Sequence, residues 1–238
     1  MITRTIAAAL GLAMLLSGPA ARAEAPDYKG FRVCTKCHDA QGDSWKKTAH
    51  ARAFESLRAG SKADVKRKAG LDPAADYTAD PNCVGCHATG HGKPGGYRVG
   101  MDADEARVLA GVGCESCHGP GGRYRDLHGA ASDRLKSAGD TSPRAPLAEA
   151  GQNFDYEQAC AACHLNFPGS GWAAAKPPHS PFTPRLDAKY THDFRRAVLA
   201  GDRNNPVHLH FRLRGVFKGD PVPAIRGEVQ AGAREAED

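Results

Sequence analysis

The sequence lacks the marks of several large protein classes. Beyond the first two dozen residues, no apolar run is long enough to cross a bilayer, so stable membrane insertion of the mature chain is not expected. No phosphate-binding loop, dinucleotide fingerprint or nucleophile–base pair stands out, so the common nucleotide-dependent and hydrolytic enzymes have no support. Apolar residues make up only 41% of the chain, so the polypeptide alone offers a modest core.

The first residues have the layout of a secretory signal peptide. Arg4 precedes an apolar run over 6–16, and small residues follow, with an Ala-Arg-Ala cleavage pattern that ends at Ala23. We expect cleavage after Ala23, with a second candidate site after Ala25. The alternative is a membrane anchor, but the run is too short to span a bilayer. The sequence therefore predicts a signal peptide over 1–23 and an exported, periplasmic domain over 24–238.

Cysteine occurs only within one pentapeptide, Cys-x-x-Cys-His, which is repeated four times and uses all 8 cysteines. This pentapeptide is the attachment motif of c-type haem. The two thiols form thioether bonds to the porphyrin, and the histidine lies under the ring plane, where its neutral imidazole can bind the iron. The predicted haem-binding residues are Cys34, Cys37 and His38; Cys83, Cys86 and His87; Cys114, Cys117 and His118; Cys160, Cys163 and His164.

A single copy of this motif would also be consistent with a redox dithiol or half of a zinc site. A disulfide framework or zinc sites built from four thiolates would not require a histidine after every second cysteine. Four copies with no cysteine left over therefore favour four covalent haem c groups, with zinc and disulfide scaffolds as the alternatives.

The formal net charge of +5 does not indicate a nucleic-acid partner. Loss of Arg4 and Arg22 with the signal peptide lowers the charge from +5 to +3. The ionised propionates of four haems then make the balance slightly negative. Many lysine and arginine side chains are better explained as partners of propionates, and charged patches steer docking to redox partner proteins.

Local patterns predict a mainly α fold, a multihaem cytochrome c with short helices and loops around four haems and few long strands. A helix is expected from about residue 43 or 44 to Gly60, with His50, Phe54 and Leu57 on one face. Further short helices are expected over 102–110, 123–127 (with His128 at its end) and 193–200. Other segments are expected to lack helix: a connector over 130–152, a stiff extended stretch over 177–184, and a fraying tail from about residue 222.

Seven of the 11 histidines lie outside the pentapeptides: His50, His91, His128, His179, His192, His208 and His210. Full bis-histidine ligation of four irons needs only four of them. His50 is favoured as a ligand over a buried, hydrogen-bonded histidine, because four irons require second ligands. His208 and His210 point the same way in an extended chain, so only one is expected to bind a given iron. After signal cleavage Met101 is the sole methionine, so histidine–methionine ligation is possible at one haem at most.

Stretches that extend beyond the pentapeptides carry a further signal. They are SWK at 44–46 with TAHA at 48–51, LDPA at 71–74 with DYT at 76–78, GVGCESCHGPG at 111–121, CHLN at 163–166, and PFTP at 181–184 with DAKYT at 187–191. Over about residues 26–218 the chain resembles the tetrahaem cytochrome c-554 family of ammonia-oxidising bacteria.

The resemblance implies a mainly helical fold with closely packed haem pairs. It also implies that electrons pass from a hydroxylamine oxidoreductase through this protein to a downstream cytochrome. Carried over by position, His50, His128 and His208 become the distal ligands of three haems, and His210 becomes a neighbour. The second haem, on His87, would be five-coordinate, with the segment around 181–182 over its open face.

The sequence departs from the family pattern at that face. His179 stands where the family has Tyr, Ser180 stands where it has Thr, and His91 and His192 replace aromatic residues. One hypothesis is that His179 closes the open iron, although the flanking prolines restrict its reach. In a host that does not oxidise ammonia, the donor would be another periplasmic oxidoreductase.

Two functions follow from these patterns. The leading prediction is a non-enzymatic periplasmic electron carrier with four haem c groups. The alternative is a small-molecule reductase, for example of nitric oxide, that acts at a five-coordinate second haem. Fast reoxidation of the fully reduced protein by nitric oxide, linked to one high-spin haem, distinguishes the reductase from the carrier.

Overall fold

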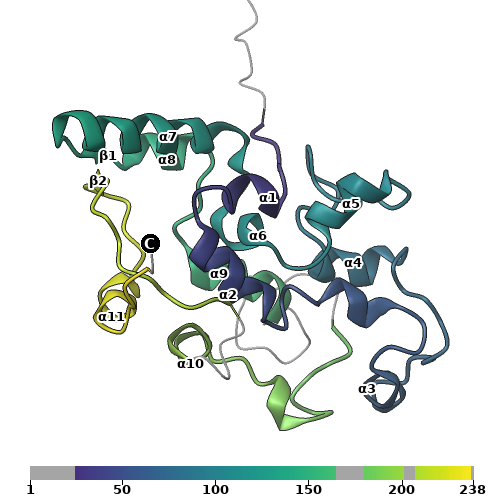
Figure 1. Cartoon of the computed structure of the whole chain (residues 1–238). Coiled ribbons are helices and arrows are strands. Elements are labelled where there is room, and N and C mark those ends of the chain that lie inside the picture. Colours follow the sequence, from purple (N-terminus) through teal and green to yellow (C-terminus); the bar gives the residue numbers. More distant parts are fainter. Residues whose placement is uncertain (1–24, 165–179, 201–206, 237–238) are drawn as a thin grey trace, which may run out of the picture.

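The computed structural model describes residues 25–164, 180–200 and 207–236, and helices are the main regular structure in these ranges (Figure 1). In chain order the helices are α1 (Phe31–Cys34), α2 (Asp39–Lys46), α3 (Ala63–Lys68), α4 (Pro81–His87), α5 (Ala103–Leu109), α6 (Cys114–His118), α7 (Gly121–Ala138), α8 (Ala145–Glu149), α9 (Tyr156–His164), α10 (Phe194–Leu199) and α11 (Arg226–Ala231). Two 3-10 turns, η1 (Phe54–Leu57) and η2 (Ala188–Tyr190), complete the set. The predicted mainly α fold is confirmed.

Strands make a small contribution in the described ranges. β1 (Ser142–Pro143) pairs in parallel with β2 (Phe217–Lys218). Figure 1 shows this pairing beside α7, where it ties the C-terminal part of the chain to the edge formed by α7 and α8. Arg144 reinforces the link, because its guanidinium donates to the carbonyl oxygen of Phe217 at 2.8 Å and is itself 5% exposed.

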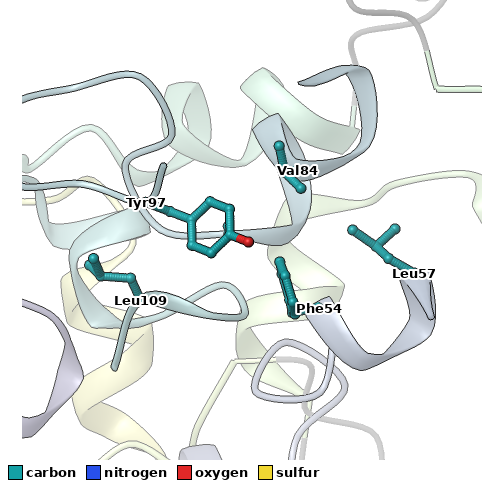
Figure 2. Packing of buried hydrophobic residues seen from close by; sticks show 6 residues of the cluster. Phe54, Leu57, Val84, Tyr97 and Leu109 are labelled. Carbon is teal, nitrogen blue, oxygen red and sulfur yellow. The ribbon is translucent and has the colours of Figure 1, made fainter. Parts of the chain in front are cut away.

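The apolar core is divided between small clusters. Figure 2 shows one of them. Phe54 and Leu57 come from η1, Val84 from α4, Tyr97 from the loop between α4 and α5, and Leu109 from α5. The rings of Phe54 and Tyr97 lie 5.2 Å apart. A second cluster holds Tyr124, Leu147 and Ala150, where α7 packs against α8. Neither cluster is large, so the core of the polypeptide is modest, as its composition predicts.

Two of the predicted helices are confirmed, and the structure shows that an aspartate caps each of them. Asp102 precedes α5 and its carboxylate accepts from the backbone nitrogen of Asp104 at 2.8 Å. Asp193 precedes α10 and accepts from the backbone nitrogen of Arg196 at 2.9 Å. Each carboxylate takes up a backbone donor that the first helical turn leaves unpaired, which is why these local signals identify the helices.

The single helix predicted from about residue 43 to Gly60 is wrong. α2 ends at Lys46, and the chain turns before η1 begins at Phe54. The Thr48 hydroxyl donates to the carbonyl oxygen of Trp45 at 2.7 Å, and the Arg52 guanidinium donates to that of Lys47 at 2.9 Å. Side chains thus take the carbonyls that a continuing helix would use, so the helix ends there. His50 therefore lies in a turn rather than on a helix.

The helix-poor connector predicted over 130–152 is also wrong. α7 runs through His128 to Ala138, and α8 follows within the same stretch. Ala and Leu favour helix in this segment, and Gly139, with a φ of 73°, ends α7 in the left-handed conformation typical of helix ends. His128 is therefore held in the middle of a long helix and not at the end of a short one.

The tail also differs from the expected fraying. α11 lies within it, and Ile225, just before this helix, is 5% exposed. Phe211 and Arg234 form a parallel bridge, and Arg195 on α10 pairs with Glu228 on α11. These long-range contacts order a segment whose polar composition suggests mobility.

Candidate haem sites

The four pentapeptides share one local geometry. Three lie in helices, because α4 and α9 each end at the histidine of a motif and α6 consists of a motif alone. In the first motif, the backbone nitrogen of His38 donates to the carbonyl oxygen of Cys34 at 3.0 Å, which is also a helical turn. Residues at i, i+3 and i+4 of a helix share one face, so each motif presents two thiols and an imidazole together.

The cysteines of different motifs meet in pairs. The side chains of Cys34 and Cys114 are in hydrogen-bonding contact, and so are those of Cys86 and Cys163. The first attachment site therefore lies against the third, and the second lies against the fourth. The third motif also lies near the fourth. Burial, and next the charge of Cys160 in the fourth motif, raise the pKa of the Cys117 thiol in the third motif to about 12.

The described residues contain neither a disulfide nor a cluster of bare-metal ligands. All eight cysteines lie in described segments, and none forms a disulfide. Within the same segments, no cluster of three or more His, Cys, Asp or Glu side chains is arranged to hold a bare metal ion. The cysteine pairs across motifs are contacts between neighbouring attachment sites and not covalent bridges.

Two of the implied distal histidines face proximal histidines at a spacing that fits an iron between them. The ring centres of His38 and His128 are 6.4 Å apart, and those of His50 and His164 are 5.8 Å apart. A metal–imidazole bond is about 2 Å long and the ring centre lies about 1 Å behind the nitrogen, so imidazoles on opposite sides of one iron are about 6 Å apart. The spacing thus suits axial ligation from two sides.

The third implied pair is His118 and His208. Burial lowers the pKa of His118 to about 3, and the charge of His208 is the next cause. His208 directly precedes Leu209, whose backbone nitrogen donates to the Ser44 hydroxyl at 2.7 Å. A contact from α2, far away in the sequence, therefore places His208 near the third motif.

Burial keeps these imidazoles neutral. Burial, and next the charge of His192, lower the pKa of His50 to about 4 and that of His164 to about 3. Burial also lowers the pKa of His38, His87 and His128. The neutral imidazole is the form that binds iron, so the sites are prepared electrostatically for ligation.

Hydrogen bonds at the rear of several rings fix which nitrogen is free. His87 Nδ1 lies 2.7 Å from the carbonyl oxygen of Ala53, and His118 Nδ1 lies 3.1 Å from the Tyr156 hydroxyl. In both histidines Nε2 is therefore the nitrogen that remains available. His128 is reversed, because its Nε2 lies 2.9 Å from Gln152 Oε1, which leaves Nδ1 as the free nitrogen. The sequence alone did not identify Gln152 or Tyr156, since no motif marks them.

The other histidines have different surroundings. His91 Nδ1 lies 3.3 Å from the carbonyl oxygen of Tyr97, and His210 Nε2 lies 2.9 Å from that of Val198. Met101 Sδ accepts from the backbone nitrogen of Arg98 at 3.3 Å and packs against the cluster of Figure 2, so its sulfur is engaged locally. His179 lies outside the described residues.

The second site differs from the other three. Among the described residues, no histidine ring pairs with that of His87 as His128 pairs with His38. Its Nδ1 is held on the rear side by Ala53 and by the Ser56 hydroxyl, at 3.2 Å. The site therefore has a proximal imidazole and no second one in the described part of the chain.

Comparisons with known proteins agree with this geometry. Residues 33–119 match the family model described as cytochrome c554 and c-prime. The chain is 46% identical over 228 residues to cytochrome c-554 of Nitrosomonas europaea, which covers 96% of this chain and 94% of that protein. The chain belongs to the cytochrome c-554 family. The solved structure of reduced cytochrome c554 from the same organism matches with a TM-score of 0.83 at 46% identity, covering 90% of this chain and 100% of that one.

Membership of the cytochrome c-554 family confirms the resemblance seen in the sequence and settles the cofactor and the general role. The protein is a c-type cytochrome that carries four haem c groups and transports electrons. None of the described helices combines the length and apolar character needed to cross a membrane.

One buried atom tests whether these residues fit the cofactor. Among the residues that the structure describes, His192 Nε2 alone is a buried side-chain polar atom without a hydrogen-bond partner. Its ring stacks on His164, with centres 4.3 Å apart and planes 13° apart. A buried polar atom without a partner is costly, and a haem at the fourth motif brings carboxylates that can pair with it. The residues therefore fit a cytochrome c-554 haem at this motif.

Proposed function

We propose that this cytochrome shuttles electrons in the periplasm, taking them from a hydroxylamine oxidoreductase-like donor and passing them to a downstream cytochrome. The observation that carries the proposal is the contact between attachment sites, Cys34 with Cys114 and Cys86 with Cys163. Bound haem supplies an iron that gains and loses one electron. Attachment sites in side-chain contact keep neighbouring haems close enough for electrons to pass along the set.

The proposal assigns each site residue a role. The eight cysteines of the motifs attach the porphyrins, and His38, His87, His118 and His164 are the proximal ligands. His128 opposes His38, His50 opposes His164, and His208 opposes His118, as the ring distances and the charge interaction suggest. Ligation from both sides leaves no position for chemistry at three irons, which suits a carrier.

The protein's own residues keep these ligands in place while the charge of the iron changes. Tyr156 and the carbonyl oxygen of Ala53 hold the rear nitrogens of His118 and His87, and Gln152 holds His128. Such rear contacts fix the orientation of a ligating imidazole and so limit the rearrangement that accompanies each electron transfer.

A distal-ligand variant tests the assignment. In His50→Ala, one haem more than in the wild-type protein is expected to be high-spin, while the mass of the protein still corresponds to four haems. His210→Ala is the matched control, because His210 lies beside His208, with ring centres 5.4 Å apart, and is not assigned to an iron. If His50→Ala has the same number of high-spin haems as the wild-type protein, the assignment of His50 is wrong.

The donor is tested with purified partners. Rapid mixing of the oxidised cytochrome with a hydroxylamine oxidoreductase and hydroxylamine should reduce its haems within the turnover time of the enzyme. The support for this donor is the 46% identity to the Nitrosomonas europaea protein. Reduction that is no faster than with hydroxylamine alone would point to another periplasmic oxidoreductase.

The periplasmic location has its own test. The proposed signal peptide, 1–23, lies outside the described residues, and attachment of c-type haem on the exported side of the membrane supports export. The protein purified from the periplasmic fraction should begin at Glu24. A mature chain that retains Met1 would contradict cleavage and favour a membrane anchor.

A second candidate function concerns the haem on His87. The described residues bring no second imidazole ring to face that of His87, which favours an iron open to a small molecule such as nitric oxide. Adding nitric oxide to the fully reduced protein should then cause fast reoxidation linked to one high-spin haem. Haems that do not react leave the carrier as the only function, and an all-low-spin spectrum would instead support closure by His179.

A further inference from the structure

Glu115 is a buried carboxylate inside the third haem motif. Its residue is 1% exposed, and it follows directly after Cys114 at the start of α6. Figure 1 shows α6 beside α1, the helix that ends at the first motif, and these two helices are in contact. Nothing in the haem-attachment chemistry requires an acid at this position, because the two residues between the cysteines are variable in the motif.

Every polar contact of this carboxylate is with a backbone N–H donor. Gly121 donates to Oε1 at 2.6 Å and Gly30 donates to Oε2 at 2.7 Å. The backbone nitrogen of Lys29 donates to both oxygens at 3.0 Å. A protonated carboxyl would have no acceptor for its own proton here, so this arrangement suits the ionised form.

The glycines make the close approach possible. Gly30 has a φ of 79°, where residues with a side chain are strained, and a Cβ there would meet Val108 at 2.7 Å. A Cβ on Gly121 would lie 3.0 Å from Glu115 Oε1. The backbone on both sides of the carboxylate is thus shaped to bring N–H groups onto it, as in an anion-binding nest.

No cation compensates the charge of Glu115 within the described residues. The ion pairs found there do not include it, and the ammonium of Lys29, whose backbone nitrogen contacts the carboxylate, pairs instead with Asp27 at 2.6 Å. Burial raises the pKa of the Glu115 carboxyl above its ordinary value, and the N–H groups of Gly121, Gly30 and Lys29 oppose this rise without cancelling it. The backbone dipoles are therefore its main stabilisation.

The charge lies where two haem sites meet. The hydrogen bond with Cys114, burial and the charge of Cys114 raise the pKa of the Cys34 thiol, and the charge of Glu115 is the next cause. It also contributes, after burial, to raising the pKa of the Tyr28 hydroxyl. The first and third motifs therefore share its field, whereas the second and fourth motifs meet elsewhere, at Cys86 and Cys163.

We propose that Glu115 is a permanent buried anion that binds the N-terminal segment to the third motif through hydrogen bonds. Its charge also lowers the reduction potentials of the two haems attached at Cys34–Cys37 and Cys114–Cys117. The ferric haem carries one more positive charge than the ferrous haem, so a nearby anion stabilises the ferric form. Burial limits screening by water and salt, so this effect persists at physiological ionic strength. The inference rests on the proposed attachment of haems at these two motifs.

Substitution Glu115→Gln in the four-haem protein tests the proposal. A redox titration followed by EPR is expected to show two of the four haems moving to higher potential. The shift expected for each is about tenfold in the ferric–ferrous equilibrium, which equals about 59 mV for one electron. Thermal unfolding should also occur at lower temperature, since the amide cannot accept all the N–H donors.

Two further variants separate charge from structure. Glu149→Gln removes an exposed acid on α8 and should leave all four potentials unchanged. Glu115→Asp keeps the charge but shortens the side chain, so stability should fall while the potentials of the pair stay near the wild-type values. If Glu115→Gln does not assemble with four haems, Glu115→Asp decides between the two explanations. A change of about tenfold in the ferric–ferrous equilibrium of the two haems would then show that geometry and not charge sets their potentials.

The outcomes are distinct from those of the proposed function. A mass below that of four haems in the wild-type protein would refute the attachment sites, whatever the potentials. With four haems present, unchanged potentials in Glu115→Gln, or equal shifts at all four haems, would overturn the proposal for Glu115. On the wild-type protein, infrared difference spectra should show that reduction of the pair perturbs an ionised carboxylate, and a protonated carboxyl band instead would also overturn it.

Discussion

The contact between Gln152 and His128 gives the sharpest test of how the ligands are held. Replacing Gln152 with Ala removes the amide oxygen that lies 2.9 Å from His128 Nε2. The backbone of residue 152 is independently held, because its nitrogen donates to the carbonyl oxygen of Leu147 at 2.9 Å. The change is therefore confined to the rear of one imidazole, and the main chain should stay in place.

The size of the effect follows from one hydrogen bond. A buried hydrogen bond contributes about 0.5–1.5 kcal/mol net, which corresponds to about a two- to tenfold change in an equilibrium. Packing limits the loss, since the rings of Tyr124 and Phe217 lie 5.6 Å and 5.1 Å from that of His128. In the ferric protein, displacement of His128 by added imidazole should therefore become about two- to tenfold more favourable, at one haem of the four.

The assay is an optical and EPR titration of the oxidised protein with imidazole. Gln152→Glu is the matched control, because a carboxylate still accepts from Nε2 and should not ease displacement. Equal affinity for imidazole in the wild-type and Gln152→Ala proteins would refute the reasoning. Easier displacement at all four haems would show a general loosening and not the loss of one contact.

Three smaller changes test other parts of the fold, each by chemical denaturation of the four-haem protein. Val84→Ala should lower the free energy of unfolding by about 2 kcal/mol, because Val84 is 0% exposed and two methyl groups are lost from the cluster of Figure 2; no loss would mean that the site collapses around the smaller side chain. Asp102→Ala should cost about 1 kcal/mol through the cap of α5, whereas Asp102→Asn should cost much less. The hydrogen bond from Lys29 lowers the pKa of Asp27, so its ion pair stabilises the fold above the ordinary carboxyl pKa of about 4 and is lost as the pH falls through the lowered value. Asp27→Asn should therefore reduce the dependence of stability on pH in that acidic range, and an unchanged pH profile would contradict this.

The attachment motifs could be recognised in the sequence because the chemistry that they imply is local. A cysteine, a second cysteine three residues on and a following histidine form one helical face without help from the rest of the chain. The caps Asp102 and Asp193 were also predictable, since a carboxylate acts on backbone donors two or three residues away. His50 was favoured as a ligand because four irons need second ligands, whereas His128 and His208 were predicted as distal ligands only through the family resemblance.

The features that could not be predicted from the sequence depend on contacts between segments. α2 ends at Lys46 because Thr48 and Arg52 take its carbonyls, although the hydrophobic spacing of His50, Phe54 and Leu57 suits a longer helix. The Glu115 carboxylate meets nitrogens of Lys29 and Gly30 some 85 residues earlier in the chain. No local pattern records such partners, so neither the end of α2 nor the role of Glu115 could be predicted.

The same long-range bonding explains how short helices hold a precise arrangement. The loop before the third motif is bonded to two other sites, because Gly111 donates to the carbonyl oxygen of His87 at 3.1 Å and Val112 donates to that of His50 at 3.0 Å. Gly111 has a φ of 88°, and a Cβ there would lie 2.8 Å from the carbonyl oxygen of Ala51. One turn of backbone thus fixes residues of three haem sites relative to each other. The positions of the sites are set by these loop contacts, while the helices fix only the geometry within each motif.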